Sequence, residues 1–254
     1  MIILVLYVDD IILAGNNQEK LQEIKSRLCD AFQMTNMGEP NMYLGMKIQR
    51  DRLNKTMTLT QTDYIEKILE RFNMKDCKAQ NFPMITRQAK RKEIESNSER
   101  HKEREIPCIA PYRETIGSLE YLSAMTRPDI TYTVNFMARK QAAPTENDWK
   151  EVKRIFRLLQ KTKEVGLVYR RGGDKLEAFT DSSFRDQTDS TSTGGYIIKL
   201  YGNTVAWRSY KQNYVSFSTC QAEYLTMSEA CQEIISLDKA IRDMTGKTYF
   251  PATI

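Results

Sequence analysis

The hydrophobic pattern of the first fifteen residues predicts a β-hairpin. Two short apolar runs rich in β-branched side chains, 2–6 and 11–14, flank the acidic pair Asp9–Asp10. Short apolar runs bounded by turn residues are typical of buried strands. Asp is tolerated in a turn because its side chain can bond the nearby backbone. We therefore expect a buried hairpin with its turn at Asp9–Asp10, and a tight turn alone is one sufficient explanation of the acidic pair.

The pattern then alternates between helix and strand. Apolar residues at helical spacing predict helices over 21–32 and 65–72. Between these helices, alternating side chains predict an antiparallel strand pair, 43–48 and 57–59, around the polar turn 50–55. This order indicates an α+β fold.

Residues 107–163 are helical by pattern, and the last helix of this region carries two opposed stripes. At about 100° per residue, Val152, Ile155, Phe156 and Leu159 share one side of a helix that runs from Asp148 to about Lys163. The opposite side holds Lys150, Arg154, Arg157 and Lys161. An amphipathic surface helix explains the apolar side, and its outer side can be a solvated face. A stripe of one charge sign is also what a phosphate backbone selects, so we favour nucleic-acid contact.

After residue 166 the spacing of hydrophobic residues changes from the helical period to the alternation typical of strands. Strands are expected over 176–181, 196–200, 205–208 and 215–218. The first of these strands ends in Asp181. Ser218 and Gln221 match a capping box, so a helix should begin there and carry Glu223 in its first turn. Taken singly, Asp181 can be a strand-end turn residue, and Glu223 can be an N-terminal charge that the helix dipole favours.

Composition narrows the function classes. Hydrophobic residues are 41% and charged residues 28%, as in ordinary soluble proteins, and a net charge of +5 is a mild bias toward polyanions. Five cysteines without a CxxC pair and a single histidine exclude a zinc site and histidine-based catalysis. The odd, widely spaced cysteines suit reduced thiols, so we expect an intracellular, cytoplasmic protein. The apolar N-terminus is broken by acids and lacks a basic region, so we expect no signal peptide and no membrane contact.

Adjacent carboxylates on so apolar a hairpin repel each other and are costly to desolvate unless a cation is bound. Mg²⁺ prefers carboxylate oxygen and binds through one or two such groups plus substrate phosphates. The sequence LYVDD at residues 6–10, followed by a strand, resembles the metal-binding hairpin of reverse transcriptases. Further blocks resemble, in order, the Pol polyprotein of copia-type LTR retrotransposons over nearly the whole chain. They are FQMTNMGEPNMYLGMKIQR, LTQTDYIEKILERFNM, PYRETIGSLEYLSAMTRPDI, AFTDSS, STGGYIIKL and AWRSYKQNYVSFSTCQAEY.

The resemblance implies the domain order. It is a partial reverse-transcriptase palm at 1–86, a charged linker at 87–106, a helical thumb or connection at 107–165, and a truncated ribonuclease H-like domain at 174–254. The fold class is then α+β, with the palm and helical thumb followed by an incomplete ribonuclease H-like mixed sheet and helix. The linker is almost wholly charged, which favours a solvated segment over a nucleic-acid contact.

The resemblance also implies the chemistry. Asp9 and Asp10 would be catalytic and would bind Mg²⁺, with Mn²⁺ as an alternative. Asp181 and Glu223 would be the first two metal-binding carboxylates of ribonuclease H. The partners would be an RNA/DNA template–primer duplex, dNTPs and the remainder of the Pol polyprotein. A virus-like particle or the nucleus is then an alternative location to the cytoplasm.

Both implied active sites are expected to be incomplete. In the family, the first palm acid lies on a strand well before the hairpin, and the next ribonuclease H acid lies on a strand after the long helix. Ser183 and Phe184 stand where the family usually has an acid and Trp, and Glu120 stands where an apolar residue is usual. Two hypotheses follow: a fragment of a polymerase with ribonuclease H that works within a longer polyprotein, or a catalytically inactive nucleic-acid-binding remnant, decayed or adopted by its host.

Overall fold

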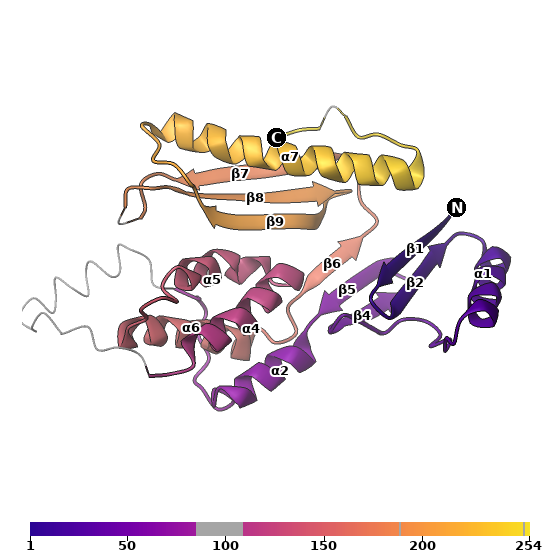
Figure 1. Cartoon of the computed structure of the whole chain (residues 1–254), viewed down its shortest axis with the longest axis horizontal. Coiled ribbons are helices and arrows are strands. Elements are labelled where there is room, and N and C mark those ends of the chain that lie inside the picture. The colour runs from indigo at the N-terminus through magenta and orange to yellow at the C-terminus, as the bar shows by residue number, and fades with distance from the viewer. Residues whose placement is uncertain (85–108, 188, 251) are drawn as a thin grey trace, which may run out of the picture.

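The structure, a computed structural model, describes residues 1–84, 109–187, 189–250 and 252–254. A hairpin with a helix, a four-stranded sheet, a cluster of helices and a three-stranded sheet under a long helix follow one another along the chain (Figure 1). The strands of each sheet are antiparallel to their neighbours, so the predicted α+β class is confirmed. The predicted charged linker lies outside the described residues.

Strands β1 (Ile2–Tyr7) and β2 (Asp10–Gly15) form the predicted hairpin, beside helix α1 (Gln18–Ala31). Tyr7 pairs with Asp10, so the turn is Val8–Asp9, and the predicted turn at Asp9–Asp10 is wrong by one residue. The expectation of a buried hairpin is also wrong, since Leu6 is 62% and Val8 78% exposed. The reason is that β1 and β2 form a two-stranded sheet of their own in the described chain, and such a sheet has no second layer unless another element covers it.

Strands β3 (Met42–Tyr43), β4 (Met46–Asp51), β5 (Thr56–Thr60) and β6 (Leu167–Arg170) form the four-stranded sheet. The predicted antiparallel pairing is confirmed as β4 with β5, but the predicted strand 43–48 is divided by a turn at Leu44–Gly45, so that β4 begins at Met46 and runs to Asp51. Strand β6 was not predicted, because its apolar run is short and its partner β5 is distant in the sequence. Its pairing with β5 brings the chain after the helices back to the first sheet.

The helices α2 (Thr62–Arg71), α4 (Tyr112–Met125), α5 (Thr131–Ala138) and α6 (Glu146–Lys161), with the 3₁₀ turn η1 (Pro128–Ile130), share one core. Their apolar stripes at helical spacing point inward, as the pattern predicts. Residues with exposures of 0–1% in this core include Ile65, Leu69, Ile116, Leu119, Leu122, Ile130, Val134, Val152, Ile155, Phe156 and Leu159.

A buried arginine ties two parts of this cluster together. Arg127 is fully buried at the end of α4. Its Nε and Nη2 donate to the Asp129 carboxylate at 2.8 and 2.7 Å. Its Nη1 and Nη2 donate to the carbonyl and hydroxyl oxygens of Thr162 at 3.0 and 2.7 Å. The turn η1 is therefore anchored to the end of α6 through one guanidinium.

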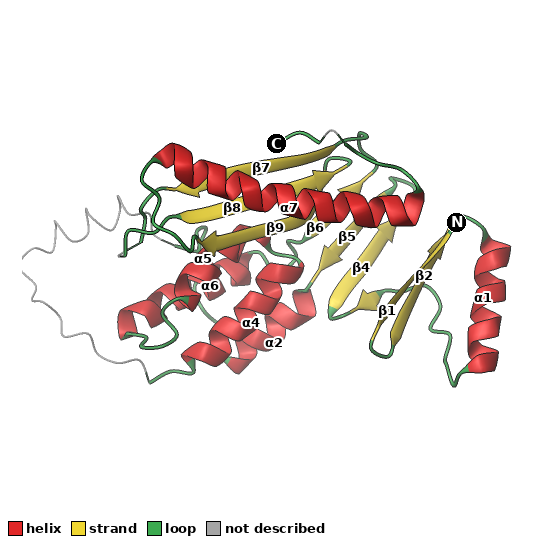
Figure 2. Cartoon of the chain, turned by 45° about the horizontal axis from the view of Figure 1, so that its top comes forward, coloured by secondary structure: helices red, strands yellow, loops and turns green. Residues whose placement is uncertain are grey.

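Strands β7 (Leu176–Ser183), β8 (Thr193–Leu200) and β9 (Asn203–Lys211) form the last sheet, and helix α7 (Thr219–Thr245) covers one face of β7 and β8 (Figure 2). The predicted cap is confirmed, since the Ser218 side chain accepts from the Gln221 amide. The core between sheet and helix includes Leu176, Ala178, Ile198, Ala230 and Ile234.

The predicted strand 215–218 is wrong, because the chain turns there. Strand β9 runs on to Lys211 and completes the meander. Gln212 then donates to the carbonyl of Ala222 and the hydroxyl of Thr226, at 2.8 and 3.1 Å, which fastens the segment to the start of α7.

The C-terminal segment returns to the open edge of β7. Thr253 pairs with Glu177 in a parallel bridge. The amide of Ala178 donates to the Thr253 carbonyl at 2.8 Å. The C-terminal segment therefore runs parallel to β7, whereas β7, β8 and β9 are antiparallel to one another, so the sheet is of the mixed type. In the part of the chain that the structure describes, no helix is long and apolar enough to cross a bilayer.

Candidate functional site

The acidic pair lies at the tip of the β1–β2 hairpin. Asp9 is the second turn residue, Asp10 opens β2, and both are exposed. The turn begins at Val8, which has a φ of 51°. A β-branched residue rarely adopts this conformation, and such outliers concentrate at functional sites. The two carboxylates are therefore presented to solvent by a tight, strained connection.

The turn between β3 and β4 is held by a tyrosine on α4. The Tyr121 hydroxyl on α4 donates to the Leu44 carbonyl at 2.6 Å, and its ring meets Tyr64 edge-on at 5.0 Å. Leu44 and Gly45 have φ of 47° and 70°, and a Cβ on Gly45 would lie 2.9 Å from the Tyr121 hydroxyl. Burial raises the pKa of Tyr121, with Tyr64 and Tyr7 as neighbouring phenols.

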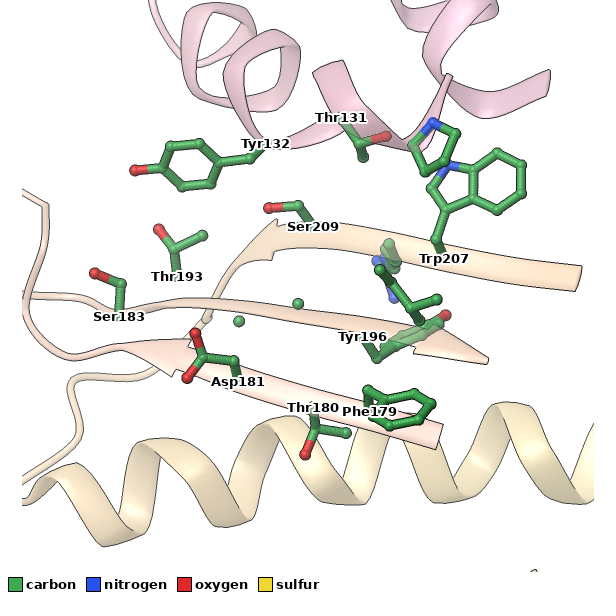
Figure 3. Close-up of a pocket in the computed structure, with 15 residues that line it drawn as sticks. Thr131, Tyr132, Phe179, Thr180, Asp181, Ser183, Thr193, Tyr196, Trp207 and Ser209 are labelled. Carbon is green, nitrogen blue, oxygen red and sulfur yellow. The ribbon is translucent and has the colours of Figure 1, made fainter. Parts of the chain in front are cut away.

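The second predicted acid pair lies at one end of β7. Glu223 lies just after the first turn of α7, which carries no acid, so its predicted first-turn position is wrong. Its carboxylate accepts a hydrogen bond from the Ser182 amide at 3.2 Å. Asp181 directly precedes Ser182. Figure 3 shows the Asp181 side chain on the face of β7 that points away from α7, toward Tyr132. The structure thus brings both acids to the same strand end, while their side chains approach it from opposite faces of the sheet.

A cavity of about 370 Å³ lies beside Asp181, between the sheet and the η1–α5 segment. Asp181, Gly195 and Ser209 form one row across β7, β8 and β9. Gly195 leaves the middle of this row without a side chain, while Tyr132 and Trp207 flank the space (Figure 3). The Asp181 carboxylate therefore faces an open space that a cation or a hydrogen-bond donor can enter.

Neither acid pair forms a complete metal cluster. Among the described residues, no group of three or more His, Cys, Asp or Glu side chains could hold a metal ion. Mg²⁺ can nevertheless bind through one or two carboxylates if water fills its other positions. Each pair therefore offers part of a Mg²⁺ site, with the remaining ligands to come from water, from substrate or from another segment.

The predicted basic stripe on α6 is only partly open to solvent. Lys150 is exposed, whereas Arg154 is half-buried and lies 3.6 Å from Glu151. The segment that follows α2 contacts the other two: the Gln80 amide donates to the Arg157 carbonyl, and Lys161 donates to Asn81. Helical periodicity predicted the stripe but carried no sign of this contacting segment. The exposed cations are thus Lys150 and Lys161, while Arg154 and Arg157 are half-buried.

Comparisons with known proteins identify the family. A model described as reverse transcriptase (RNA-dependent DNA polymerase) matches residues 1–86. The retrovirus-related Pol polyprotein from transposon TNT 1-94 of Nicotiana tabacum is 33% identical over 244 residues, which are 96% of this chain and 18% of that relative. The Pol polyprotein from transposon RE2 of Arabidopsis thaliana is 31% identical over 236 residues, 92% of this chain and 16% of that relative. The chain belongs to the Pol polyproteins of copia-type retrotransposons.

This Pol chain therefore spans less than a fifth of the length of these two relatives. An uncharacterized mitochondrial protein of Arabidopsis thaliana is similar in extent: it is 31% identical over 233 residues, 91% of this chain and 92% of that protein. No solved structure matches the Pol chain.

Sequence reasoning missed the contact that holds the β3–β4 turn of this Pol chain. Tyr121 and Leu44 are 77 positions apart, so no local pattern connects them. A signal was nevertheless present in Gly45, which interrupts an otherwise regular strand. A glycine inside a strand pattern often marks a close approach by another group, and here that group is the Tyr121 hydroxyl.

Proposed function

We propose that this Pol chain is part of an RNA-directed DNA polymerase in which Asp9 and Asp10 bind Mg²⁺. The observation that carries the proposal is the exposed acid pair at the strained hairpin tip. Carboxylate oxygens suit Mg²⁺, and Mn²⁺ fits the same oxygens. When bound, the ion would polarise phosphoryl oxygens and stabilise the charge that develops during nucleotide transfer. The partners are a template–primer duplex, dNTPs and the remainder of a Pol polyprotein.

Primer extension on an RNA template tests this proposal. We expect no product from residues 1–254 alone, because two-metal transfer needs more carboxylates than the hairpin tip offers. A fusion to the Pol segment that precedes the matching region in the tobacco relative should extend the primer in Mg²⁺ and in Mn²⁺. A fusion that folds, binds the duplex and makes no product would contradict the proposal.

A ribonuclease H activity is proposed for the last sheet and α7. Its support is the order of elements: an acid-bearing strand, a meander, a helix with Glu223 near its N-terminus, and a parallel bridge from Thr253 to the edge of β7. Asp181 and Glu223 would hold the metal together with acids that follow in the polyprotein. The test is cleavage of an RNA–DNA hybrid by a chain extended with the Pol segment that follows in the tobacco relative. A folded extended chain that leaves the RNA intact would contradict this part.

The α6 stripe is proposed to contact phosphates of the duplex. Changing Lys150 and Arg154 to Gln should reduce the slope of log K against log salt by about 0.9 per lost contact. Changing Arg157 and Lys161 to Gln should reduce the slope less, because Arg157 is half-buried and the Lys161 ammonium already donates to Asn81. Fluorescence anisotropy of a labelled hybrid across salt concentrations measures both slopes.

The double substitution of Lys150 and Arg154 by Gln is also expected to change the free energy of unfolding by no more than about 0.5 kcal/mol, as is usual for surface positions. An unchanged salt slope for that pair would make the stripe a solvated face.

The alternative function is a catalytically inactive nucleic-acid-binding remnant. It is favoured by the lack of a three-acid cluster among the described residues. The same fusion separates the two functions, since a remnant would bind the hybrid with the usual salt dependence and still make no product.

A further inference from the structure

A second cavity, of about 410 Å³, lies over the ends of β4, β5 and β6, which are adjacent in the sheet. We call it the basic pocket. The residues that line it are Arg50, Asp51, Arg52, Lys55, Thr56, Met57, Tyr169 and Arg170. It belongs to neither acid pair and lies on other elements than the α6 stripe.

Its charge is strongly unbalanced. Among the described residues that line the basic pocket, four are cations and one is an acid. That acid, Asp51, is engaged within its own turn, because its carboxylate accepts from the Asn54 amide and side chain at 2.9 and 2.6 Å. These bonds lower the pKa of Asp51, so the carboxylate stays ionised while it faces the turn. The remaining lining charge is positive.

Two of the cations are held in place by one oxygen. Glu39 Oε1 accepts from Arg50 at 2.8 Å and from Arg52 at 2.7 Å. A guanidinium carries five N–H donors, so a single bond to Glu39 leaves each one most of its donors for a ligand. A shared acceptor also keeps two like charges on the same side of the sheet edge. The pair is therefore oriented before any ligand arrives.

The side of the pocket formed by β6 is fixed by hydrogen bonds between the Asn203 side chain and the Arg170 backbone. Asn203, at the start of β9, accepts from the Arg170 amide at 2.7 Å and donates to the Arg170 carbonyl at 2.8 Å. Met57 and Tyr169 pair across β5 and β6 and give the pocket an apolar floor. Burial raises the pKa of Tyr169, so its hydroxyl remains neutral. A cationic rim over an apolar, partly aromatic floor matches a phosphate joined to a sugar and a base.

The placement of Arg50 and Arg170 indicates more than one phosphate. Arg50 pairs with Met57, whereas Arg170 pairs with the neighbouring residue Thr56. Successive residues of a strand point to opposite faces, so the two arginines leave the sheet on opposite faces at its end. Successive phosphates of a strand that passes this end can contact both. Guanidinium groups suit phosphate because their planar donors can bind two oxygens at once.

We propose that the basic pocket binds the phosphodiester backbone of a nucleic-acid strand, with Arg50, Arg52, Lys55 and Arg170 as its phosphate contacts. The proposal rests on the proposed function, since it names a further contact for the same template–primer duplex. It adds a site on the four-stranded sheet, on the opposite end of β4 from the turn that Tyr121 holds.

The test is hybrid binding by residues 1–254 with all four cations of the basic pocket changed to Gln. The slope of log K against log salt should fall by about 0.9 for each lost contact, and affinity at 0.1 M salt should fall at least tenfold. The matched control changes Lys20, Arg27, Lys67 and Lys239 to Gln, which removes the same charge from exposed positions on α1, α2 and α7. The control should keep most of the slope.

Each other outcome overturns the proposal. Equal slopes for the pocket and control variants, with duplex binding intact, would reject the basic pocket and leave the proposed function standing. Displacement of the hybrid by inorganic phosphate, beyond the effect of KCl at equal ionic strength, would make it a small-anion site. No hybrid binding by the unchanged chain would reject both proposals. Circular dichroism melting must show that the pocket variant is folded as well as the control variant.

Discussion

Asp129→Ala is expected to lower the free energy of unfolding by about 3–5 kcal/mol, the range found when one partner of a buried ion pair is removed. Asp129 itself is 44% exposed, and exposed positions usually change stability by about 0.5 kcal/mol or less. The large expected effect arises from Arg127, which is fully buried and donates two hydrogen bonds to the Asp129 carboxylate. Without that carboxylate, the guanidinium remains inside the helical cluster, and among the described residues only the carbonyl and hydroxyl oxygens of Thr162 accept its hydrogen bonds.

The Arg127→Met variant separates charge from packing. It removes the buried cation and retains most of the side-chain volume, so it should cost less than Asp129→Ala. The double variant should be no less stable than Arg127→Met alone, because the carboxylate then has no buried charge to compensate. Glu120→Ala is the matched control, since it removes an exposed acid from the neighbouring helix α4. Urea unfolding followed by circular dichroism measures all four, and an Asp129→Ala value close to that of Glu120→Ala would contradict the prediction.

The helical cluster shows how far periodicity carries a prediction. The apolar residues Val152, Ile155 and Leu159 were placed on one face from spacing alone, and all three are fully buried. Spacing predicts the buried face here because a helix repeats every 3.6 residues, so the residues of one face recur within a short stretch of sequence. The cap at Ser218 is equally local and was equally predictable.

The contacts that shape the candidate sites are long-range and had no such signature. Arg127 reads in the sequence as a charge before a proline, and its burial depends on Thr162 at the end of another helix. The exposure of the β1–β2 hairpin was mispredicted for a related reason. Apolar alternation shows that a strand can be buried, but the covering layer must come from elsewhere. For the hairpin, the described chain supplies α1 beside β2 and no further strand.

The acid residues illustrate the same limit. The sequence predicted which strand and helix carry Asp181 and Glu223, and the structure places both at one end of β7. It could not predict that Asp181 would face the cavity lined by Tyr132 while Glu223 would contact the Ser182 amide from the side of α7. That arrangement follows from strand alternation combined with the position of α7. Neither is encoded by the spacing of the two acids.

Asp10→Asn is expected to lower kcat for nucleotide addition at least about 100-fold in the fusion that completes the polymerase. Removing one preorganised electrostatic contact typically costs that much, and charge stabilisation supplies most of phosphoryl-transfer catalysis. Asn keeps the shape of the side chain but offers a neutral oxygen, whereas Mg²⁺ is bound best by carboxylates. The backbone pairing of Asp10 with Tyr7 is unaffected, so the hairpin should keep its fold.

The matched control is Asp30→Asn, which makes the same charge change at an exposed position on α1. Its kcat should stay within about twofold of the parent, as expected for a surface change far from the chemistry. Single-turnover primer extension at saturating template–primer measures the effect, and hybrid binding by anisotropy shows that the Asp10→Asn protein still holds its substrate. Loss of binding together with rate would indicate that Asp10 supports the fold of the tip and not the metal. A rate within threefold of the parent would contradict the prediction and show that the acid pair has only a structural role in the turn.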